Sequence, residues 1–466
     1  MMHLKSIIQP ILNRDFILGY MASLVLLLPI YLLHINVNVS ILTFNVNILS
    51  IVQIIILCTS LYLIKLKKFE ENILGILSGV ASLILAFYFR SLMHTFSNIV
   101  EWDFLCFYLN GKATVDGLSL YDPSSFSNVL SNVHLPFNLS NSFYTGAIQT
   151  GVIYPPTTML LLAPLGYMDV NTANIVWRIF VLSFLVIDII LLNKIFKIHE
   201  SKWIQFAIIV TLTLIFPGSK GTLDVSQTNF FVLFLLLLIY KEPDNWKAGI
   251  YLAIAVIVKP IPLVLSLYFI VNKKWKPLFS FIISGMVIVL LSIIQLGFNN
   301  FMTYFTSPPV LRIPSSSFSE DVNQSINAVF SRISLQMGLD SILKHMNGIV
   351  LILTLILVIL ACFASFKLAK TNTKASFLIF LPLSLLIFPG TLTHYAVHLI
   401  PLLMAMILIK DMTSLIYFST FLIIIYFSLF MASFIILSVI IIYAFLNIPI
   451  FTKLEIKRDL SNPNSQ

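Results

Sequence analysis

The sequence predicts an all-α polytopic membrane protein, and three observations support this. Apolar residues make up 59% of the 466 residues, while charged residues make up only 10%. Soluble globular proteins carry roughly 25% charged residues, so a soluble fold could not hide this much apolar side chain. The apolar residues also form repeated runs of about 20, the length that a helix needs to cross a bilayer. We expect about 12–14 such hydrophobic segments.

The charged residues exclude several other classes of protein. The net charge is +9, but the lysines and arginines occur in twos and threes between the apolar runs. This distribution is typical of cytoplasmic membrane loops and argues against nucleic acid as a partner. The three cysteines are far apart and show no zinc-ligand spacing.

One apolar stretch decides the predicted topology. Residues 247–272 are apolar except for Lys259-Pro260, so they form either one span with a buried lysine or two short helices. The two-helix version, with 152–167 dipping in without crossing, places most of the 28 basic residues on the inside, as the positive-inside rule requires. We therefore favour fourteen segments with both termini cytoplasmic. The other runs are 16–33, 49–64, 72–90, 174–192, 203–217, 227–240, 277–298, 348–366, 376–391, 396–409, 413–429 and 430–450.

This topology gathers the remaining polar residues on the outer face. That face receives two long loops, 91–151 and 300–346, together with the Lys259-Pro260 break and the turn Thr391–His398. We therefore expect an extracytoplasmic working site at the membrane surface.

The first outer loop begins with Glu101-Trp102-Asp103-Phe104, about ten residues beyond the third span. Partial desolvation at the lipid–water boundary raises the proton affinity of a carboxylate and suits it to general-base work. A helix cap or an ordinary solvated acid is the alternative. Further along, Tyr154-Pro155-Pro156 opens an apolar segment, either as a simple re-entrant helix or as a ramp for a lipid chain.

Lys259 is the second candidate, because a lysine inside an apolar stretch usually marks a ligand or a pathway. If the helix breaks there, the ammonium group can hold a lipid-linked phosphate. Snorkelling to lipid headgroups is the alternative.

Two further polar clusters lie in the outer turns. Asn323-Gln324-Ser325 followed by Arg332 is suited to bind sugar hydroxyls and a phosphate, unless Asn323 only caps a short helix. His394 and His398 share one helical face. Hydrogen bonding to a phosphate and interfacial anchoring are both open for them, whereas metal binding would need further ligands.

The order of these features resembles glycosyltransferase family 87, in the broader GT-C class. The likeness covers roughly residues 70–410. It is carried by the following segments: Asp103-Phe104 with Phe107-Tyr108, Gly117 with Tyr121-Asp122-Pro123, Tyr154-Pro155-Pro156 with Pro164-Leu165, Gln227-Thr228-Asn229, Lys259-Pro260-Ile261-Pro262 with Lys273-Lys274-Trp275, and Asn323-Gln324-Ser325 with Arg332.

The resemblance implies a GT-C-like helix bundle whose outer loops carry short helices. It divides the chain into an N-terminal helical pair (1–70), a catalytic membrane domain (71–410), and C-terminal helices with a cytoplasmic tail (411–466). It also implies inverting transfer of a hexose, most simply mannose, from a polyprenyl-phosphate donor to a lipid or glycan acceptor. Asp103 would then be the general base, and Lys259, Arg332 and His394 or His398 would stabilise the departing phosphate.

The remaining expectations complete this hypothesis. No cofactor or divalent metal is expected, because basic side chains can meet the phosphate. The expected partners are the donor, the acceptor and membrane lipids, with a monomer as the default and the plasma or inner membrane as the location. A transporter or flippase, and a polysaccharide ligase or polymerase, are the alternatives. The candidate substrate-binding residues are Glu101, Tyr108, Tyr154, Gln227, Asn229, Asn323 and Gln324.

Overall fold

The computed structural model describes residues 14–32, 38–41, 44–47, a few positions between 55 and 63, and residues 70–96, 102–118, 120–121, 154–306, 323–336 and 340–408. Most of these residues are helical, as predicted; the others form turns, connections and an antiparallel hairpin of β1 (Asn38–Ile41) and β2 (Phe44–Asn47). Most of the predicted segment 49–64, and the last two segments between 413 and 450, lie outside the described residues. The three-part division of the chain stays a prediction.

The helices in the first part of the chain are α2 (Arg14–Leu32), α4 (Glu70–Phe96), α5 (Trp102–Val115), η1 (Pro156–Thr158), α8 (Met159–Gly166), α9 (Val170–Ile195), α10 (Lys202–Ile215), α11 (Pro217–Asp224) and α12 (Asn229–Lys241). Those in the second part are α13 (Trp246–Val258), η2 (Ile261–Leu265), α14 (Ser266–Val271), α15 (Trp275–Leu296), α16 (Phe298–Thr306), α18 (Ile326–Gln336), α19 (Asp340–Ala369), α20 (Thr373–Leu378), α21 (Phe380–Ile387), η4 (Thr393–Leu399) and α22 (Ile400–Leu408).

Three helices in the described part are long and apolar enough to cross a membrane: α9, α15 and the segment Gly348–Ala369 of α19. A fourth crossing arises if α10 and the segment Gly218–Asp224, which are bent by 60° relative to each other, count as one span. Other apolar helices are short. At 1.5 Å per residue, α13 with its 13 residues rises about 20 Å, less than the roughly 30 Å hydrocarbon core. The chain is a helical membrane protein, and the count of fourteen segments stays a prediction.

Capping residues and prolines set the helix ends. The Asp169 carboxylate accepts from the amides of Asn171 and Thr172 and starts α9. Asn245 starts α13 in the same way. The predicted break at Lys259-Pro260 is confirmed, because α13 ends at Val258 and Lys259 is extended, with φ −147° and ψ 130°. A proline disfavours helical geometry in the residue before it, which explains why the helix stops there.

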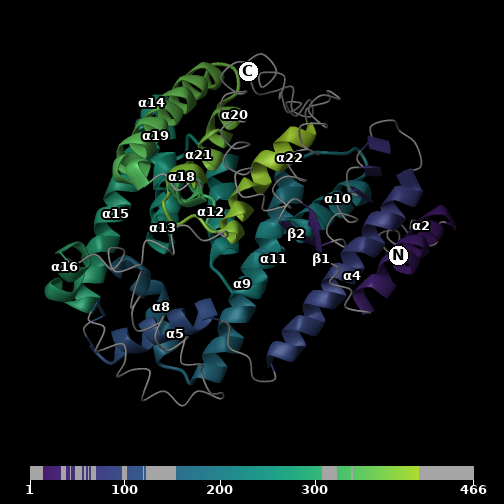
Figure 1. Ribbon diagram of the computed structural model, residues 1–466, viewed down its shortest axis with the longest axis horizontal. Helices are drawn as coiled ribbons and strands as arrows, with labels where there is room; N and C mark the ends of the chain where they lie inside the picture. The colour runs from purple at the N-terminus through teal and green to yellow at the C-terminus, as the bar shows by residue number, and fades with distance from the viewer. Residues whose placement is uncertain are drawn as a thin grey trace, which may run out of the picture.

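Small residues allow close packing between α5 and α8. A Cβ atom on Gly111 of α5 would lie 2.3 Å from the carbonyl oxygen of Leu162, and one on Gly166 would lie 2.4 Å from the Gly111 carbonyl. The backbones of α5 and α8 therefore touch at these two glycines. Figure 1 shows α5 and α8 together at one end of the molecule, away from α14 and α20.

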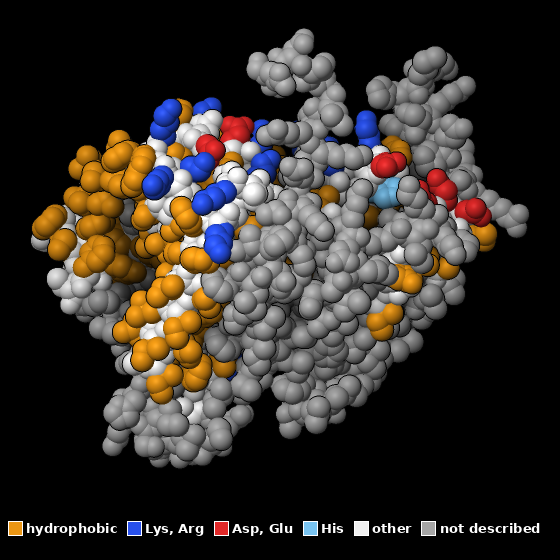
Figure 2. Space-filling view, turned by 90° about the horizontal axis from the view of Figure 1, so that it is seen from above, with side chains coloured by type: hydrophobic (Ala, Val, Ile, Leu, Met, Phe, Trp, Pro, Cys, Tyr) orange, Lys and Arg blue, Asp and Glu red, His pale blue; other side chains and the backbone are white. Residues whose placement is uncertain are grey.

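The opposite end of the molecule is rich in lysine. Figure 2 views this end and shows Lys and Arg side chains grouped beside apolar outer surfaces. Exposed lysines lie at or near the ends of α12 and α19 and at or near the starts of α13 and α15. They are Lys241, Lys247, Lys273, Lys276, Lys367 and Lys370. Lys274 pairs with Asp244 at 2.7 Å, and the Lys374 ammonium lies 5.7 Å from the centre of the Tyr240 ring. These contacts place the α12–α13, α14–α15 and α19–α20 connections on the same side of the molecule.

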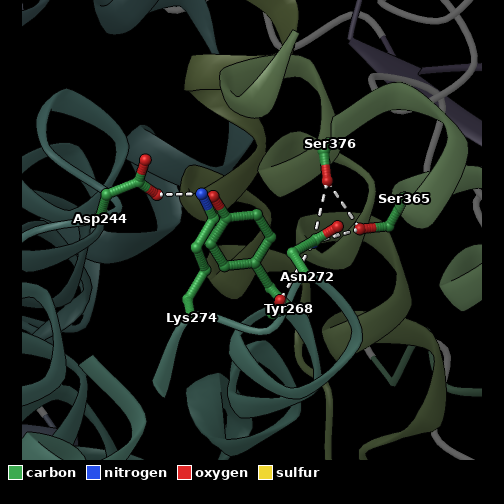
Figure 3. Close-up of polar contacts among 6 residues, drawn as sticks. All are labelled: Asp244, Tyr268, Asn272, Lys274, Ser365 and Ser376. Atoms are coloured by element: carbon green, nitrogen blue, oxygen red, sulfur yellow. Dashed lines mark hydrogen bonds and ion pairs between the residues drawn. The ribbon is translucent and has the colours of Figure 1, made fainter. Parts of the chain in front are cut away.

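A buried polar cluster joins the helices at this end. The Asn272 amide donates to Ser365 Oγ at 2.9 Å, to Ser376 Oγ at 3.1 Å and to the Tyr268 carbonyl at 3.0 Å. Figure 3 shows Asn272 beside the two serines, which also contact each other, with the Lys274–Asp244 pair nearby. The Asn272 cluster, consisting of Asn272, Ser365 and Ser376, therefore fastens α14 to α19 and α20.

Candidate functional site

Asp103 lies in the first turn of α5 and is held by the start of α12. Its Oδ2 accepts a 2.6 Å hydrogen bond from Nε2 of Gln227. The carboxylate thus makes a contact across the bundle. Burial raises the pKa of Asp103 above its ordinary value, while the Gln227 hydrogen bond and the nearby charge of Lys259 act in the opposite direction.

Lys259 is buried at the break after α13. Its ammonium donates to Oδ1 of Asn229 at 2.7 Å and lies 3.8 Å from the centre of the Tyr395 ring. The ammonium also interacts electrostatically with the Asp103 carboxylate. The acid and the cation predicted from distant parts of the sequence therefore belong to one buried cluster.

The two predicted histidines join the same cluster. His394 and His398 of η4 are both buried, and both interact electrostatically with Lys259. Nε2 of each ring has no hydrogen-bond partner among the described residues. Buried polar atoms normally find partners, and the prediction that these two nitrogens meet a phosphate stays a prediction.

The Tyr154-Pro155-Pro156 segment connects the acid to the cation. Tyr154 packs against Phe107 of α5, with ring centroids 5.1 Å apart, and interacts electrostatically with Asp103. Just beyond it, the Thr158 hydroxyl donates to the carbonyl of Ile257 at 2.7 Å. The segment therefore touches the surroundings of Asp103 at one end and the helix end before Lys259 at the other.

The second outer loop packs onto the turn that precedes the histidines. Nδ2 of Asn323 donates to the Pro389 carbonyl at 2.8 Å, and the Gln324 amide donates to the Thr391 carbonyl at 2.7 Å. Nη1 of Arg332 donates to the Asn323 carbonyl at 2.7 Å. These contacts shape the loop, and the side-chain cap of α18 comes from Ser325, whose hydroxyl accepts from the Ala328 backbone amide at 3.2 Å. Sugar or phosphate binding by this cluster stays a prediction.

The remaining predicted residues lie apart or outside the description. The Tyr108 hydroxyl donates to the Met168 carbonyl at 3.1 Å and fastens α5 to the start of α9. Glu101 lies outside the described residues. No group of three or more His, Cys, Asp or Glu residues that could hold a metal ion occurs in the described ranges, and the expectation of no metal stays a prediction.

The structure adds residues that the sequence reading missed. Tyr395 lies under the Lys259 ammonium, and the Thr222 hydroxyl accepts from Nδ2 of Asn229 at 3.0 Å. Within α9, Asp188 and Arg178 are also buried. Asp188 and Arg178 could have been singled out from the sequence, since charged residues inside an apolar run are rare and usually functional. Tyr395 and Thr222 carried none, because their partners are distant in sequence.

A close backbone contact supports the histidine segment and gives the first prediction. A Cβ on Gly218 of α11 would lie 2.6 Å from the Val397 amide nitrogen, so Gly218→Ala forces η4 to move. We expect activity to fall by about 10- to 100-fold and stability by about 1–3 kcal/mol. Activity assays and thermal unfolding measure the two effects.

Gly285→Ala in α15 is the matched control, because a Cβ there meets nothing within 4 Å. It should leave activity unchanged. Equal activity in the two variants would show that η4 need not be held in place.

Comparison with known proteins assigns this helical membrane protein to a family. The sequence profile of glycosyltransferase family 87 matches residues 153–389, just over half of the chain. The chain therefore belongs to glycosyltransferase family 87 and is a membrane glycosyltransferase. The match includes Gln227, Asn229 and Lys259, ends shortly before His394, and begins after Asp103. No curated protein and no solved structure gave a match.

Proposed function

We propose that the protein transfers a hexose, with mannose as the first candidate, from a polyprenyl-phosphate donor to a hydroxyl group of a lipid or glycan acceptor. Asp103 takes the proton from the acceptor hydroxyl. The acceptor oxygen then attacks the anomeric carbon, and the bond from that carbon to the phosphate oxygen breaks. The electron pair leaves with the phosphate, so the configuration inverts and the products are the glycoside and polyprenyl phosphate.

The observation that carries this proposal is the buried contact network around Asp103 and Lys259. A general base needs a positioned carboxylate, and a raised pKa brings it nearer to neutral pH. A departing phosphate gains from a fixed cation in a water-poor site. Lys259 supplies that cation, and the unpartnered Nε2 atoms of His394 and His398 provide further hydrogen-bonding groups beside it.

The position of the cluster supports an extracytoplasmic site. Lys259 follows the last residue of α13, about 20 Å from the start of that helix near Asp244. Asp244 belongs to the lysine-rich end, which the positive-inside rule assigns to the cytoplasm. Asp103 and Lys259 then face the outer side of a plasma or inner membrane.

Supplying the purified protein with a synthetic polyprenyl monophosphate sugar tests the proposal. The expected result is a new glycoside and free polyprenyl phosphate, both detected by mass spectrometry. Use of a diphosphate-linked glycan alone would favour a polymerase or ligase. Movement of the lipid-linked sugar across vesicles without a new glycosidic bond would favour a flippase, and either outcome would contradict the proposal.

A further inference from the structure

Gln227 and Asn229, on either side of the N-cap residue Thr228 of α12, each contact one member of the acid–cation pair. Gln227 donates to the Asp103 carboxylate at 2.6 Å, and Asn229 accepts from the Lys259 ammonium at 2.7 Å. A carboxylate only accepts hydrogen bonds and an ammonium only donates them. The two amide side chains therefore face their partners with opposite ends.

Other contacts fix the orientation of each amide. Oε1 of Gln227 accepts from the Thr228 amide at 3.3 Å, which leaves its NH₂ group for Asp103. Nδ2 of Asn229 donates to the Thr222 hydroxyl at 3.0 Å and to the His394 carbonyl at 3.1 Å, which leaves its oxygen for Lys259. Neither amide can turn over without losing these bonds.

The backbone before α12 is held as well. Ser226 has φ 54°, in the left-handed region that residues other than glycine rarely adopt. The Ser226 carbonyl accepts from the Trp177 indole at 2.7 Å. The backbone N–H of Gln227 donates to the Thr222 carbonyl at 2.9 Å. Gln227 and Asn229 are both buried, so the turn and its surroundings hold both side chains in place.

We propose that Gln227 and Asn229 are positioning residues, which set the placement of Asp103 relative to Lys259, and that they do not bind the sugar. This inference rests on the proposed function. Gln227 stabilises the ionised carboxylate, and Asn229 stabilises the ammonium. The described titratable groups that interact electrostatically with Asp103 are Lys259, Tyr154, Tyr395 and Cys106.

Gln227→Glu tests the first half, because it replaces a donor to Asp103 by a second acid. We expect kcat at neutral pH to fall by about 10- to 100-fold and KM for the donor to change by less than about threefold. A second carboxylate beside Asp103 raises the pKa of the pair, because two adjacent negative charges repel each other. The acidic limb of the pH–rate profile should therefore move up by about 1–2 pH units. Part of the activity should return in alkaline solution.

Asn229→Asp tests the second half, because a carboxylate against Lys259 offsets the charge that a phosphate would meet. Inhibition by the product polyprenyl phosphate should weaken by about tenfold or more. Unchanged inhibition would overturn this half of the inference.

Two amides away from the site, the buried Gln205 and the half-buried Asn272, provide matched controls. Gln205 donates to the carbonyl and the side chain of Asn193, and Asn272 joins the Asn272 cluster (Figure 3). Gln205→Glu and Asn272→Asp should leave the pH profile and product inhibition unchanged, even where they lower thermal stability.

The outcomes separate this inference from the function on which it rests. An active Asp103→Asn variant would contradict the assigned base, and hence the proposed function. If Asp103→Asn is inactive but Gln227→Glu raises only KM and keeps the wild-type pH profile, Gln227 binds substrate and the positioning role is wrong. A loss of folding in Gln227→Glu is detected by thermal unfolding, and Gln227→Leu, which removes the donor without adding charge, then takes its place with the same upward shift expected.

Discussion

Asp103→Asn is expected to abolish sugar transfer while the protein stays folded. A positioned general base contributes about 10²–10⁴-fold, which corresponds to about 3–5 kcal/mol of transition-state stabilisation. Asparagine has nearly the same shape, and its carbonyl oxygen can still accept from Nε2 of Gln227. Activity with the polyprenyl monophosphate sugar and thermal unfolding of the detergent-solubilised protein check the two parts of the prediction.

The control for this substitution lies at the other end of the same helix. Asp116 follows α5 and pairs with Lys112 at 3.1 Å, and both side chains are partly exposed. An exposed pair of this kind contributes about 0–1 kcal/mol, so Asp116→Asn should leave transfer within about twofold of the wild type. If Asp103→Asn keeps more than about a tenth of the activity, Asp103 is not the base.

The sequence predicted what depends on local chemistry. Apolar run lengths predicted a helical membrane protein, and Pro260 predicted the helix break that exposes Lys259 to the site. The resemblance to glycosyltransferase family 87 is confirmed by the profile match. These features follow from composition, from proline geometry and from the order of short motifs along the chain.

What the sequence could not predict is which polar residues face one another. Gln227 and Asn229 contact Asp103 and Lys259, which lie 124 and 30 positions away, and no local pattern indicated these contacts. Arg332 donates to the carbonyl of Asn323, and its contact with a phosphate stays a prediction. A side chain's partner is decided by how helices pack, and one sequence contains no direct signal for that packing.

Lys259→Met is the second substitution with a large expected effect. Methionine fills similar space without the charge, so the departing phosphate loses its fixed cation. Loss of one such electrostatic contact lowers kcat by about 10²–10³-fold. The Asn229 oxygen also loses its donor, which costs about 1–3 kcal/mol, although removal of a buried charge offsets part of this.

Lys374→Met is a closely matched control. The Lys374 ammonium also lies over a tyrosine ring, 5.7 Å from the centre of Tyr240, but at the lysine-rich end. Its replacement removes a lysine and an ammonium–ring contact without touching the site. Transfer should stay close to the wild-type rate, and an equal loss in both variants would show that the effect of Lys259→Met is not local.

Product inhibition separates the roles of the two central residues. Polyprenyl phosphate keeps its negative charge after transfer, so Lys259→Met should weaken its binding by about tenfold or more. Asp103→Asn removes a negative charge from the same cluster and should leave that binding equal or tighter. Both variants are expected to be nearly inactive, yet only Lys259→Met should lose affinity for the product. If both variants bind polyprenyl phosphate as the wild type does, the phosphate is held elsewhere and Lys259 has only a structural role.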